Sequence, residues 1–173
     1  MADLPLFPLN TVLFPGMQLK LHIFEERYKL MINQCIDTDA PFGVVLIQDG
    51  QEALGPLAKP HEIGCTAQIT QVQRLPFERL NITATGQRRF RIRSIKQHSP
   101  YLIGDVEFFA PEDDQPDLVE QLGRQLRPLI ARYLEILSQI GEVQFNAMNI
   151  PHDARSLAHV AAIMLQGENP QKQ

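Results

Sequence analysis

The three side-chain types of a hydrolytic triad occur close together near the C-terminus, as Asp153, Ser156 and His159. Their spacing places them on one predicted helix, whereas a working triad gathers its groups from separate elements and presents the nucleophile on an exposed turn. Asp153 more simply caps that helix, because the helix dipole favours a carboxylate at the N-terminus. We therefore predict no catalytic residues. A hydrolase that uses His159 or His22 is kept as an alternative, which a concave pocket with two polar groups from distant segments would favour.

Two other patterns have only some of the residues that a phosphate site or a metal site requires. Gly50 and Gly55 are separated as in a phosphate loop, but a proline and a leucine follow Gly55 where lysine and serine or threonine are needed. His61 and Cys65 are four residues apart, yet two ligands do not complete a zinc site and the sequence has no second pair. We therefore expect no metal and no cofactor.

A basic segment could contact phosphate groups or an acidic peptide. Its cations are Arg88, Arg89, Arg91, Arg93 and Lys96. The alternation of a strand turns Phe90 and Ile92 toward the core and the arginines at 89, 91 and 93 outward. The simpler interpretation is a solvated sheet face with ion pairs to Glu78 or Glu107, and a core phenylalanine cannot also stack on bases. Binding of RNA or a nucleotide at Arg88–Arg93 is therefore the alternative hypothesis.

The elements that position these residues are mostly strands up to about residue 110. Residues at 24–36 have helical spacing, which predicts one amphipathic helix. The prolines of segment 4–9 favour an extended chain. Alternating or continuous apolar patterns predict strands at 18–23, 42–48, 63–73, 79–85, 87–97 and 102–109, with a break at Gly86 and a loop at 50–62. Short strands joined by turns favour a sandwich or barrel.

The chain beyond residue 110 changes character. Residues 111–117 are acidic and contain two prolines, and helical spacing follows to the end. The predicted apolar stripe of the first of these helices consists of Leu118, Leu122, Leu126, Leu129, Tyr133 and Leu137. Pro128 should kink or split that helix. Pro151 should start another, with Leu157, Val160, Ala161 and Met164 inward. We predict an α+β protein with a β-rich subdomain at 1–110 and a helical subdomain at 111–173.

Composition and charge restrict the class of protein. The chain has 173 residues, of which 44% are hydrophobic and 21% charged, as in ordinary globular proteins. The net charge of −4 comes from residues 111–173, so nucleic acid is not the expected main partner. Cys35 and Cys65 form no CxxC motif, and no secretory leader is evident, so we expect two buried, reduced thiols in a cytoplasmic protein. The apolar runs are too short to span a membrane.

Several segments together resemble the N-terminal domain of the Lon protease family. In order they are 4–9 (LPLFPL), 12–16 (VLFPG), 21–28 (LHIFEERY), 42–45 (FGVV), 63–67 (IGCTA), 80–86 (LNITATG) and 89–92 (RFRI). The resemblance implies a PUA-like β-barrel or sandwich with one embedded helix, followed by a helical segment. In Lon proteases this region helps to select protein substrates and carries neither the ATPase nor the serine–lysine peptidase. The same fold occurs in RNA-binding domains, which keeps the RNA hypothesis open by analogy.

The resemblance and the local sequence together predict a non-catalytic module that binds unfolded or exposed polypeptide segments and lacks the ATPase and peptidase parts of Lon. The prolines at 4–9 and 14–16 leave backbone groups with which an extended peptide could pair. The charged residues of the first helix would form a rim that orients the peptide. The candidate site residues are Phe14, Pro15, Phe24, Glu25, Glu26, Arg27 and Lys29.

We predict that the purified protein neither hydrolyses ATP nor cleaves casein. The phosphate-loop pattern lacks its lysine and its serine or threonine, and the triad residues share one helix. Phosphate release and casein gels measure this. Turnover that copurifies with the wild-type protein and disappears in a single-residue variant would contradict the prediction.

Overall fold

The computed structural model describes residues 2–98, 100–109, 115–139 and 150–164. These residues divide into two compact units, one within residues 1–110 and the other within 111–166, and each unit is described by itself. Compact units of one chain need not be separate domains, so the predicted subdomains at 1–110 and 111–173 stay a prediction. Among the described helices, none combines the length and the apolar character needed to cross a membrane.

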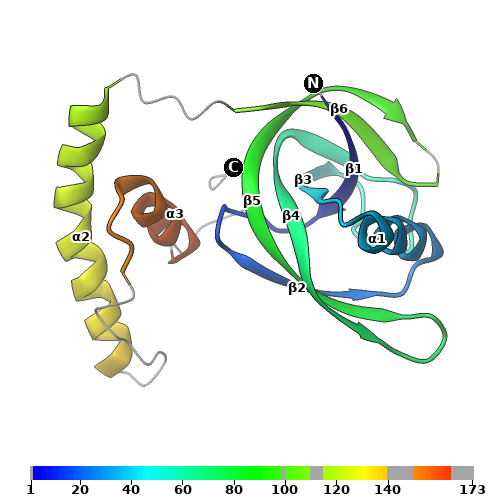
Figure 1. The fold of residues 1–173 in the computed structure, drawn as a ribbon, viewed down its shortest axis with the longest axis horizontal. Coiled ribbons are helices and arrows are strands. Elements are labelled where there is room, and N and C mark those ends of the chain that lie inside the picture. The colour runs from blue at the N-terminus through cyan, green and yellow to red at the C-terminus, as the bar shows by residue number, and fades with distance from the viewer. Residues whose placement is uncertain (1, 99, 110–114, 140–149, 165–173) are drawn as a thin grey trace. The chain divides into compact units, whose positions relative to one another are not determined.

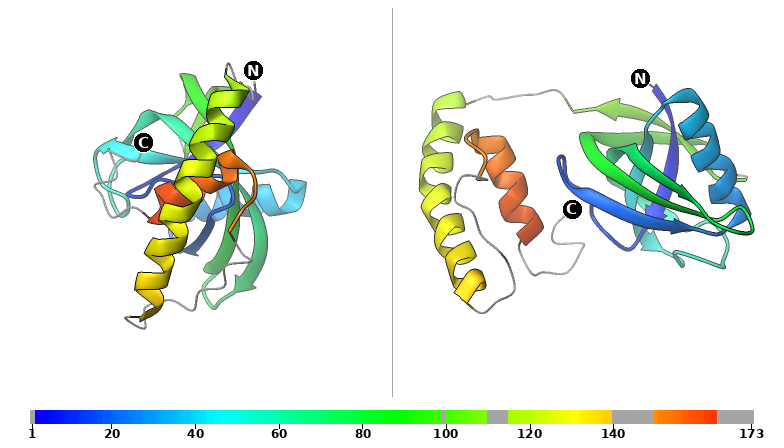
Figure 2. Two further views of the ribbon diagram at one scale, coloured as in Figure 1. Left: turned by 90° about the vertical axis from the view of Figure 1, so that its left-hand side faces the viewer. Right: turned by 60° about the horizontal axis from the view of Figure 1, so that its bottom comes forward.

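The first unit is built on a six-stranded sheet whose order is β2-β5-β4-β3-β1-β6. Its strands are β1 (Ala2–Leu9), β2 (Gln18–Ile23), β3 (Phe42–Asp49), β4 (Lys59–Arg74), β5 (Leu80–Gln97) and β6 (Leu102–Phe108). β1 and β3 are parallel and all the other pairs are antiparallel. An additional pairing of β5 with β6 closes the sheet into a barrel, and β2 lies outside it on the first half of β5 (Figure 1; Figure 2, right).

One helix, α1 (Glu26–Thr38), packs against the barrel and buries its apolar face (Figure 1). Tyr28 and Met31 of this helix join a core cluster with Phe7 and Phe42, and the rings of Phe7 and Tyr28 stack at 4.0 Å. The helix begins two residues later than predicted, because β2 continues to Ile23 and the capping residue is still extended. A second cluster fills the barrel around Phe90, which is fully buried.

β5 is one continuous strand, so the prediction that Gly86 separates two strands is wrong. A Cβ at Gly86 would lie 2.2 Å from the carbonyl oxygen of Phe14, so glycine is required there by the close approach of the preceding loop. The ladder with β4 has an irregularity between Cys65 and Ala67. The Thr66 hydroxyl fills it, because its Oγ1 accepts a hydrogen bond from the backbone N–H of Arg88 at 3.1 Å.

The prediction of an open edge at segment 4–9 is only partly right, because β1 lies between β3 and β6 in the sheet but each of its halves pairs with only one of them. Residues 2–6 pair with β6 and residues 6–9 pair with β3. Each half of β1 therefore forms a ladder of hydrogen bonds on one side only. On the unpaired side no ladder bond is lost, although Pro5 and Pro8 have no backbone N–H. Segment 14–16 is a turn rather than an edge, since the Met17 N–H donates to Phe14.

The second unit consists of α2 (Pro116–Gln139) and α3 (Ala154–Met164), which meet around Ile130, Leu134 and Leu157. The predicted stripe of α2 is wrong: its exposed members are Leu118, Leu122, Leu129 and Tyr133. Apolar residues occupy more than one face of α2, and α3 packs on only one of them. The second predicted stripe is partly right, because Leu157 is buried and Val160, Ala161 and Met164 pack against the cluster.

Both prolines of this unit differ from expectation. α2 continues through Pro128 without being split. α3 starts at Ala154 rather than at Pro151, and Asp153 is its cap, since the Ser156 N–H donates to Asp153 Oδ1 at 2.8 Å. That hydrogen bond is the main reason that the pKa of Asp153 is lowered. The capping role predicted for Asp153 is thus confirmed.

We expect Phe90→Ala to lower the free energy of unfolding by about 3–5 kcal/mol, because it removes a fully buried ring. Arg91→Ala should cost about 1 kcal/mol or less, since Arg91 is exposed and its guanidinium lies over the ring of Phe109. Denaturant melts of the two variants compare these values. Equal losses would show that the faces of β5 are reversed.

Candidate functional site

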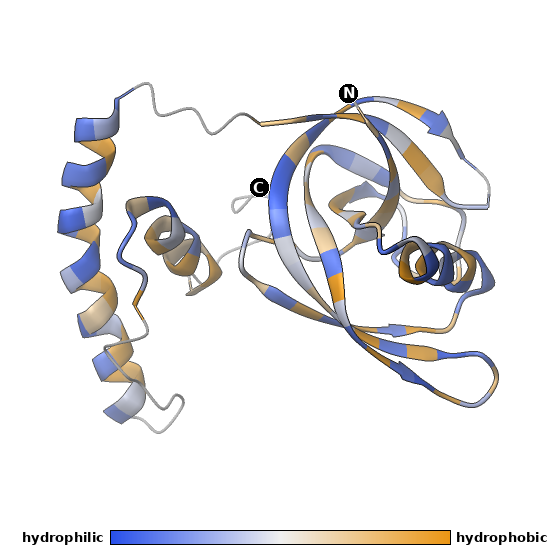
Figure 3. Ribbon diagram, in the orientation of Figure 1, coloured by the Kyte–Doolittle hydropathy of each residue, from blue (hydrophilic) through white to orange (hydrophobic). Residues whose placement is uncertain are grey.

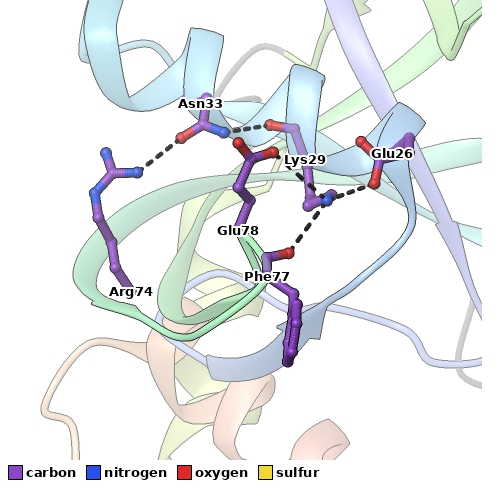
Figure 4. A network of polar contacts seen from close by, with 6 residues as sticks. All are labelled: Glu26, Lys29, Asn33, Arg74, Phe77 and Glu78. Atoms are coloured by element: carbon purple, nitrogen blue, oxygen red, sulfur yellow. Dashed lines mark hydrogen bonds and ion pairs between the residues drawn. The ribbon is translucent and has the colours of Figure 1, made fainter.

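Lys29 joins the start of α1 to the tip of the β4–β5 hairpin, as Figure 4 shows. Its side chain is buried, and its Nζ lies 2.5 Å from Glu26 Oε1 on the same helix. The same ammonium donates to the backbone carbonyl of Phe77 at 3.4 Å and lies 3.9 Å from Glu78 Oε2. An amine buried to this extent needs such partners, so its contacts fix the hairpin tip relative to the helix.

The hairpin tip has an unusual backbone. Phe77 and Glu78 have φ angles of 62° and 56°, in the left-handed region that non-glycine residues rarely occupy. The tip is closed by a hydrogen bond of 2.8 Å from the Leu75 N–H to the Arg79 carbonyl. The result is that the Phe77 side chain is 83% exposed, although it is a large aromatic residue.

A second set of contacts holds the hairpin stem to α1. Asn33 Nδ2 donates to the carbonyl of Lys29 at 2.9 Å, and Arg74 Nη1 donates to Asn33 Oδ1 at 3.3 Å (Figure 4). The helix therefore contacts both the end of β4 and the tip that follows it. Because two sets of contacts hold the hairpin to α1, the exposed Phe77 is preorganised for contact with a ligand rather than part of a frayed loop.

Other exposed apolar residues lie near this tip. Phe24 is 40% exposed, stacks on His22 at 5.9 Å, and follows Ile23, which pairs with Leu80 at the start of β5. Val72 is also 40% exposed, but it pairs with Ile82 and therefore lies on the opposite face of the sheet from His22 and Phe24. We call Phe24 and Phe77 the hairpin surface. Such a group of exposed apolar side chains is typical of a surface that contacts other molecules.

A polar hollow of about 580 Å³ adjoins the hairpin surface on the outer face of β2, β5 and β4. His22 Nδ1 lies 2.7 Å from Asn81 Oδ1, and Asn81 Nδ2 donates to Gln73 Oε1 at 3.0 Å. Because the amide nitrogen of Asn81 is a donor, its oxygen accepts from the Nδ1–H of His22. The three side chains form a hydrogen-bonded row across the three strands.

Only some of the side chains in the predicted charged rim of α1 are exposed. Glu26 is exposed, but Lys29 is buried and Arg27 is half-buried. Arg27 Nη2 pairs with Glu25 at 2.7 Å, Nη1 donates to the carbonyl of Gly55 at 3.0 Å, and the guanidinium lies 4.8 Å from the Tyr28 ring. The predicted rim is therefore incomplete, because the 50–58 loop contacts one side of α1 and the hairpin contacts the other.

The structure also separates the predicted site residues. Phe14 and Pro15 precede β2, whereas Phe24 follows it, and a six-residue strand spans about 20 Å. Phe14 and Pro15 thus lie near Gly86, away from the hairpin surface. Phe77 lies between the strands predicted at 63–73 and 79–85 and was not among the predicted site residues. A large aromatic at the tip of a turn was the available signal.

The basic segment of β5 has two kinds of partner. Arg93 forms the predicted ion pair with Glu107, whereas Glu78 contacts Lys29 instead. Three guanidinium groups lie over rings from the end of β6, with Arg88 over Phe108 at 4.4 Å and Arg89 and Arg91 over Phe109 at 4.9 and 5.6 Å. Phe90 is buried as predicted, and the rings beside these arginines come instead from residues 108 and 109.

The described residues show little that resembles catalytic chemistry. Both cysteines are free and buried, as predicted, and burial raises the pKa of Cys35 to about 11 and of Cys65 to about 12. Thiols with such pKa values stay protonated near neutral pH. His61 and Cys65 both lie in β4, which begins at Lys59 rather than at residue 63. Within the described ranges, no three potential ligands of a metal ion come together.

Comparison with known proteins decides the family. A family model of the ATP-dependent protease La (LON) substrate-binding domain matches residues 3–173. The chain belongs to the Lon substrate-binding domain family. Lon protease 2 of Myxococcus xanthus is 27% identical over 139 residues, which are 79% of this chain and 17% of that protein. The Lon protease of Cytophaga hutchinsonii is 26% identical over 176 residues, which cover 98% of this chain and 21% of that protein.

This Lon-family chain thus spans about a fifth of the length of the curated relatives it matches. A Lon N-terminal domain protein from Xanthomonas campestris has a crystal structure with a TM-score of 0.67 and 25% identity, covering 99% of this chain and 88% of that one. The N-terminal domain of a Mycobacterium avium complex Lon protease has a TM-score of 0.64 and 17% identity, covers 99% and 87%, and shows the fold alone. These neighbours confirm the α+β class, and the PUA-like description agrees with them.

We expect Lys29→Met to increase the hydrogen-exchange rate of the Leu75 amide about tenfold, because the hairpin-closing bond loses its support from α1. The free energy of unfolding should fall by only about 1 kcal/mol, since the carboxylates released are exposed. Exchange monitored by NMR gives both values.

Glu26→Ala is the matched control, because it removes the ion pair with Lys29 and keeps the hydrogen bond to Phe77. Its effect on the Leu75 amide should be smaller. An unchanged exchange rate in Lys29→Met would show that Lys29 does not hold the hairpin.

Proposed function

We propose that this Lon substrate-binding domain homologue is a non-catalytic module that binds unfolded or exposed polypeptide at the hairpin surface. The observation that carries the proposal is Phe77, which is 83% exposed on a left-handed backbone that a buried lysine contacts. Folding normally buries a ring of this size, so its display at a held position favours a binding role. The family is named for substrate binding, which supports polypeptide as the ligand.

The surroundings of Phe77 suit a flexible chain. Phe24 adds apolar area, and the polar hollow adds hydrogen-bonding side chains for a peptide backbone. Glu78 and Arg79 supply opposite charges at the tip, which orient a ligand more than they bind it. Ordering a flexible chain offsets much of the contact energy, so the dissociation constant should be micromolar or weaker.

The proposed module is cytoplasmic and does not catalyse a reaction. Free, buried thiols at Cys35 and Cys65 support the cytoplasm, where thiols stay reduced. Their raised pKa values and the capping role of Asp153 support a module that binds without catalysing. Partner proteins that supply an ATPase or peptidase would then act on what this module holds.

One observation favours RNA as a second candidate ligand. Arg88, Arg89 and Arg91 lie over Phe108 and Phe109, and the described residues include no carboxylate paired with these three arginines. Guanidinium groups ordered on rings can contact phosphates, and exposed rings can stack on bases. Phe109 is 36% exposed, much less than Phe77, and the net charge of the chain is negative. These facts make RNA the weaker candidate.

We expect the wild-type protein to bind a fluorescently labelled, permanently unfolded protein such as reduced and carboxymethylated lactalbumin with micromolar affinity. Phe77→Ser should weaken binding about fivefold or more, because a central aromatic contact is lost. Leu54→Ser is the matched control, since Leu54 is 84% exposed and also has a positive φ but lies in the 50–58 loop. Fluorescence anisotropy measures each affinity.

Equal loss in both variants, or none in Phe77→Ser, would remove the hairpin surface from the proposal. A parallel titration with mixed single-stranded RNA at two salt concentrations tests the second candidate. Micromolar RNA binding with a steep salt dependence, lost in Arg89→Ala with Arg91→Ala, would replace polypeptide with RNA.

A further inference from the structure

β2 is an edge strand within the described part of the chain. It pairs with β5 on one side, and the order of the sheet places no strand on its other side. Figure 1 and the right-hand view of Figure 2 show it on the outside of the barrel. An edge strand exposes one row of backbone N–H and C=O groups that another chain can pair with.

The hydrogen bonds at the start of β2 show which residues expose those groups. The Gly86 N–H donates to the carbonyl of Met17 at 2.9 Å. In an antiparallel ladder, residues that bond to the partner strand alternate with residues that do not. With the register of β2 and β5, Leu19, Leu21 and Ile23 bond to β5. The backbone groups of Gln18, Lys20 and His22 then point to the open edge.

The described residues supply no backbone partner for these outward groups. They also supply no side-chain partner for them, because the side-chain hydrogen bond of these outward residues joins the imidazole of His22 to Asn81 and leaves the backbone groups unused. The edge therefore offers the backbone N–H and C=O groups of three residues, each two positions from the next, which is the spacing that a second strand requires.

β2 also has two distinct faces. Leu19 and Ile23 are buried and Leu21 is half-buried, whereas Lys20 and His22 are exposed. The hydropathy colouring of the β2 ribbon alternates accordingly between hydrophobic and hydrophilic (Figure 3). Lys20 and His22 line the polar hollow, and they pair with Thr83 and Asn81 of β5. A strand added beside β2 would continue both faces, so it would place apolar residues beside the leucines and polar residues beside Lys20 and His22.

Charge selects the chain that fits this edge. β2 contains Lys20 and no acidic residue. A second copy pairing through β2 would bring Lys20 and His22 of each copy against the other, and like charges across a ladder are unfavourable. A chain with acidic residues at its polar positions is favoured instead.

We propose that β2 binds an extended polypeptide segment of alternating apolar and acidic residues as an additional antiparallel or parallel strand. The inference rests on the proposed function and names the class of segment that is bound. The six residues of β2 span about 20 Å, which matches a bound segment of about six residues. The hairpin surface lies beyond the Ile23 end of this edge, so an aromatic residue beyond that end of the segment would contact it.

The experiment uses the full chain and a capped heptapeptide in which valine and glutamate alternate. Lys20→Pro removes an outward N–H and leaves the ladder with β5 intact, as proline does at an edge. Lys20→Ala removes the same charge and keeps the N–H. We expect Lys20→Ala to weaken peptide binding about threefold and Lys20→Pro to weaken it about tenfold further.

Two further probes keep the test independent of the proline variant, should it fail to fold by circular dichroism. The same peptide methylated on alternate backbone nitrogens should not bind, and a peptide of alternating valine and lysine should bind about tenfold less tightly. The amide protons of Lys20 and His22 should become protected from hydrogen exchange when the valine–glutamate peptide is added.

Each outcome separates this inference from the proposed function. Binding of the unfolded lactalbumin probe with no protection of Lys20 and His22, and no effect of methylating the peptide, would overturn the edge inference and leave the hairpin surface standing. Failure of the wild-type protein to bind any unfolded chain would overturn both. Concentration-dependent dimerisation that Lys20→Pro abolishes would make a second copy the occupant and overturn the proposal.

Discussion

Closure of the barrel depends on β5, which pairs with different strands along its length. Its first half lies between β2 and β4, and its second half lies between β4 and β6. A strand that changes neighbours must bend, and it does so at Gly86 and at the irregularity that Thr66 fills. The same change of neighbours leaves β2 with one partner. The open edge and the closed barrel are thus two results of one bent strand.

The charged residues of α1 contribute more to positioning than to solvation. Burying an ammonium or a guanidinium is costly unless hydrogen bonds replace water. Lys29 meets this condition with a carboxylate and a backbone carbonyl, and Arg27 meets it with Glu25 and Gly55. Arg27 Nε is buried and has no hydrogen-bond partner among the described residues, so the hydrogen bonding of this guanidinium is incomplete. The helix thereby fixes a loop on one side and the exposed Phe77 on the other.

Two surfaces of the first unit are suited to different ligands for physical reasons. The hairpin surface offers apolar area beside a polar hollow, which suits a flexible polypeptide. Three arginines of β5 lie over phenylalanine rings, and a fourth, Arg93, is paired with Glu107, which reduces the charge available to phosphates. The name of the Lon substrate-binding domain family supports polypeptide as the proposed ligand.

The sequence by itself determined the family, the α+β class and the faces of individual strands, because these depend on local alternation and on motifs in a fixed order. Phe90 is buried and Arg91 exposed, as period-two alternation requires, and Asp153 caps α3. Only the tertiary structure decided which strand is the edge, since β1, whose prolines predicted an edge, lies between β3 and β6 and pairs with one of them along each half, whereas β2 has one described neighbour. It also decided the solvent exposure of Lys29, Leu122 and Phe77. Helical spacing says which residues share a face, but which face is covered depends on elements far away in the sequence.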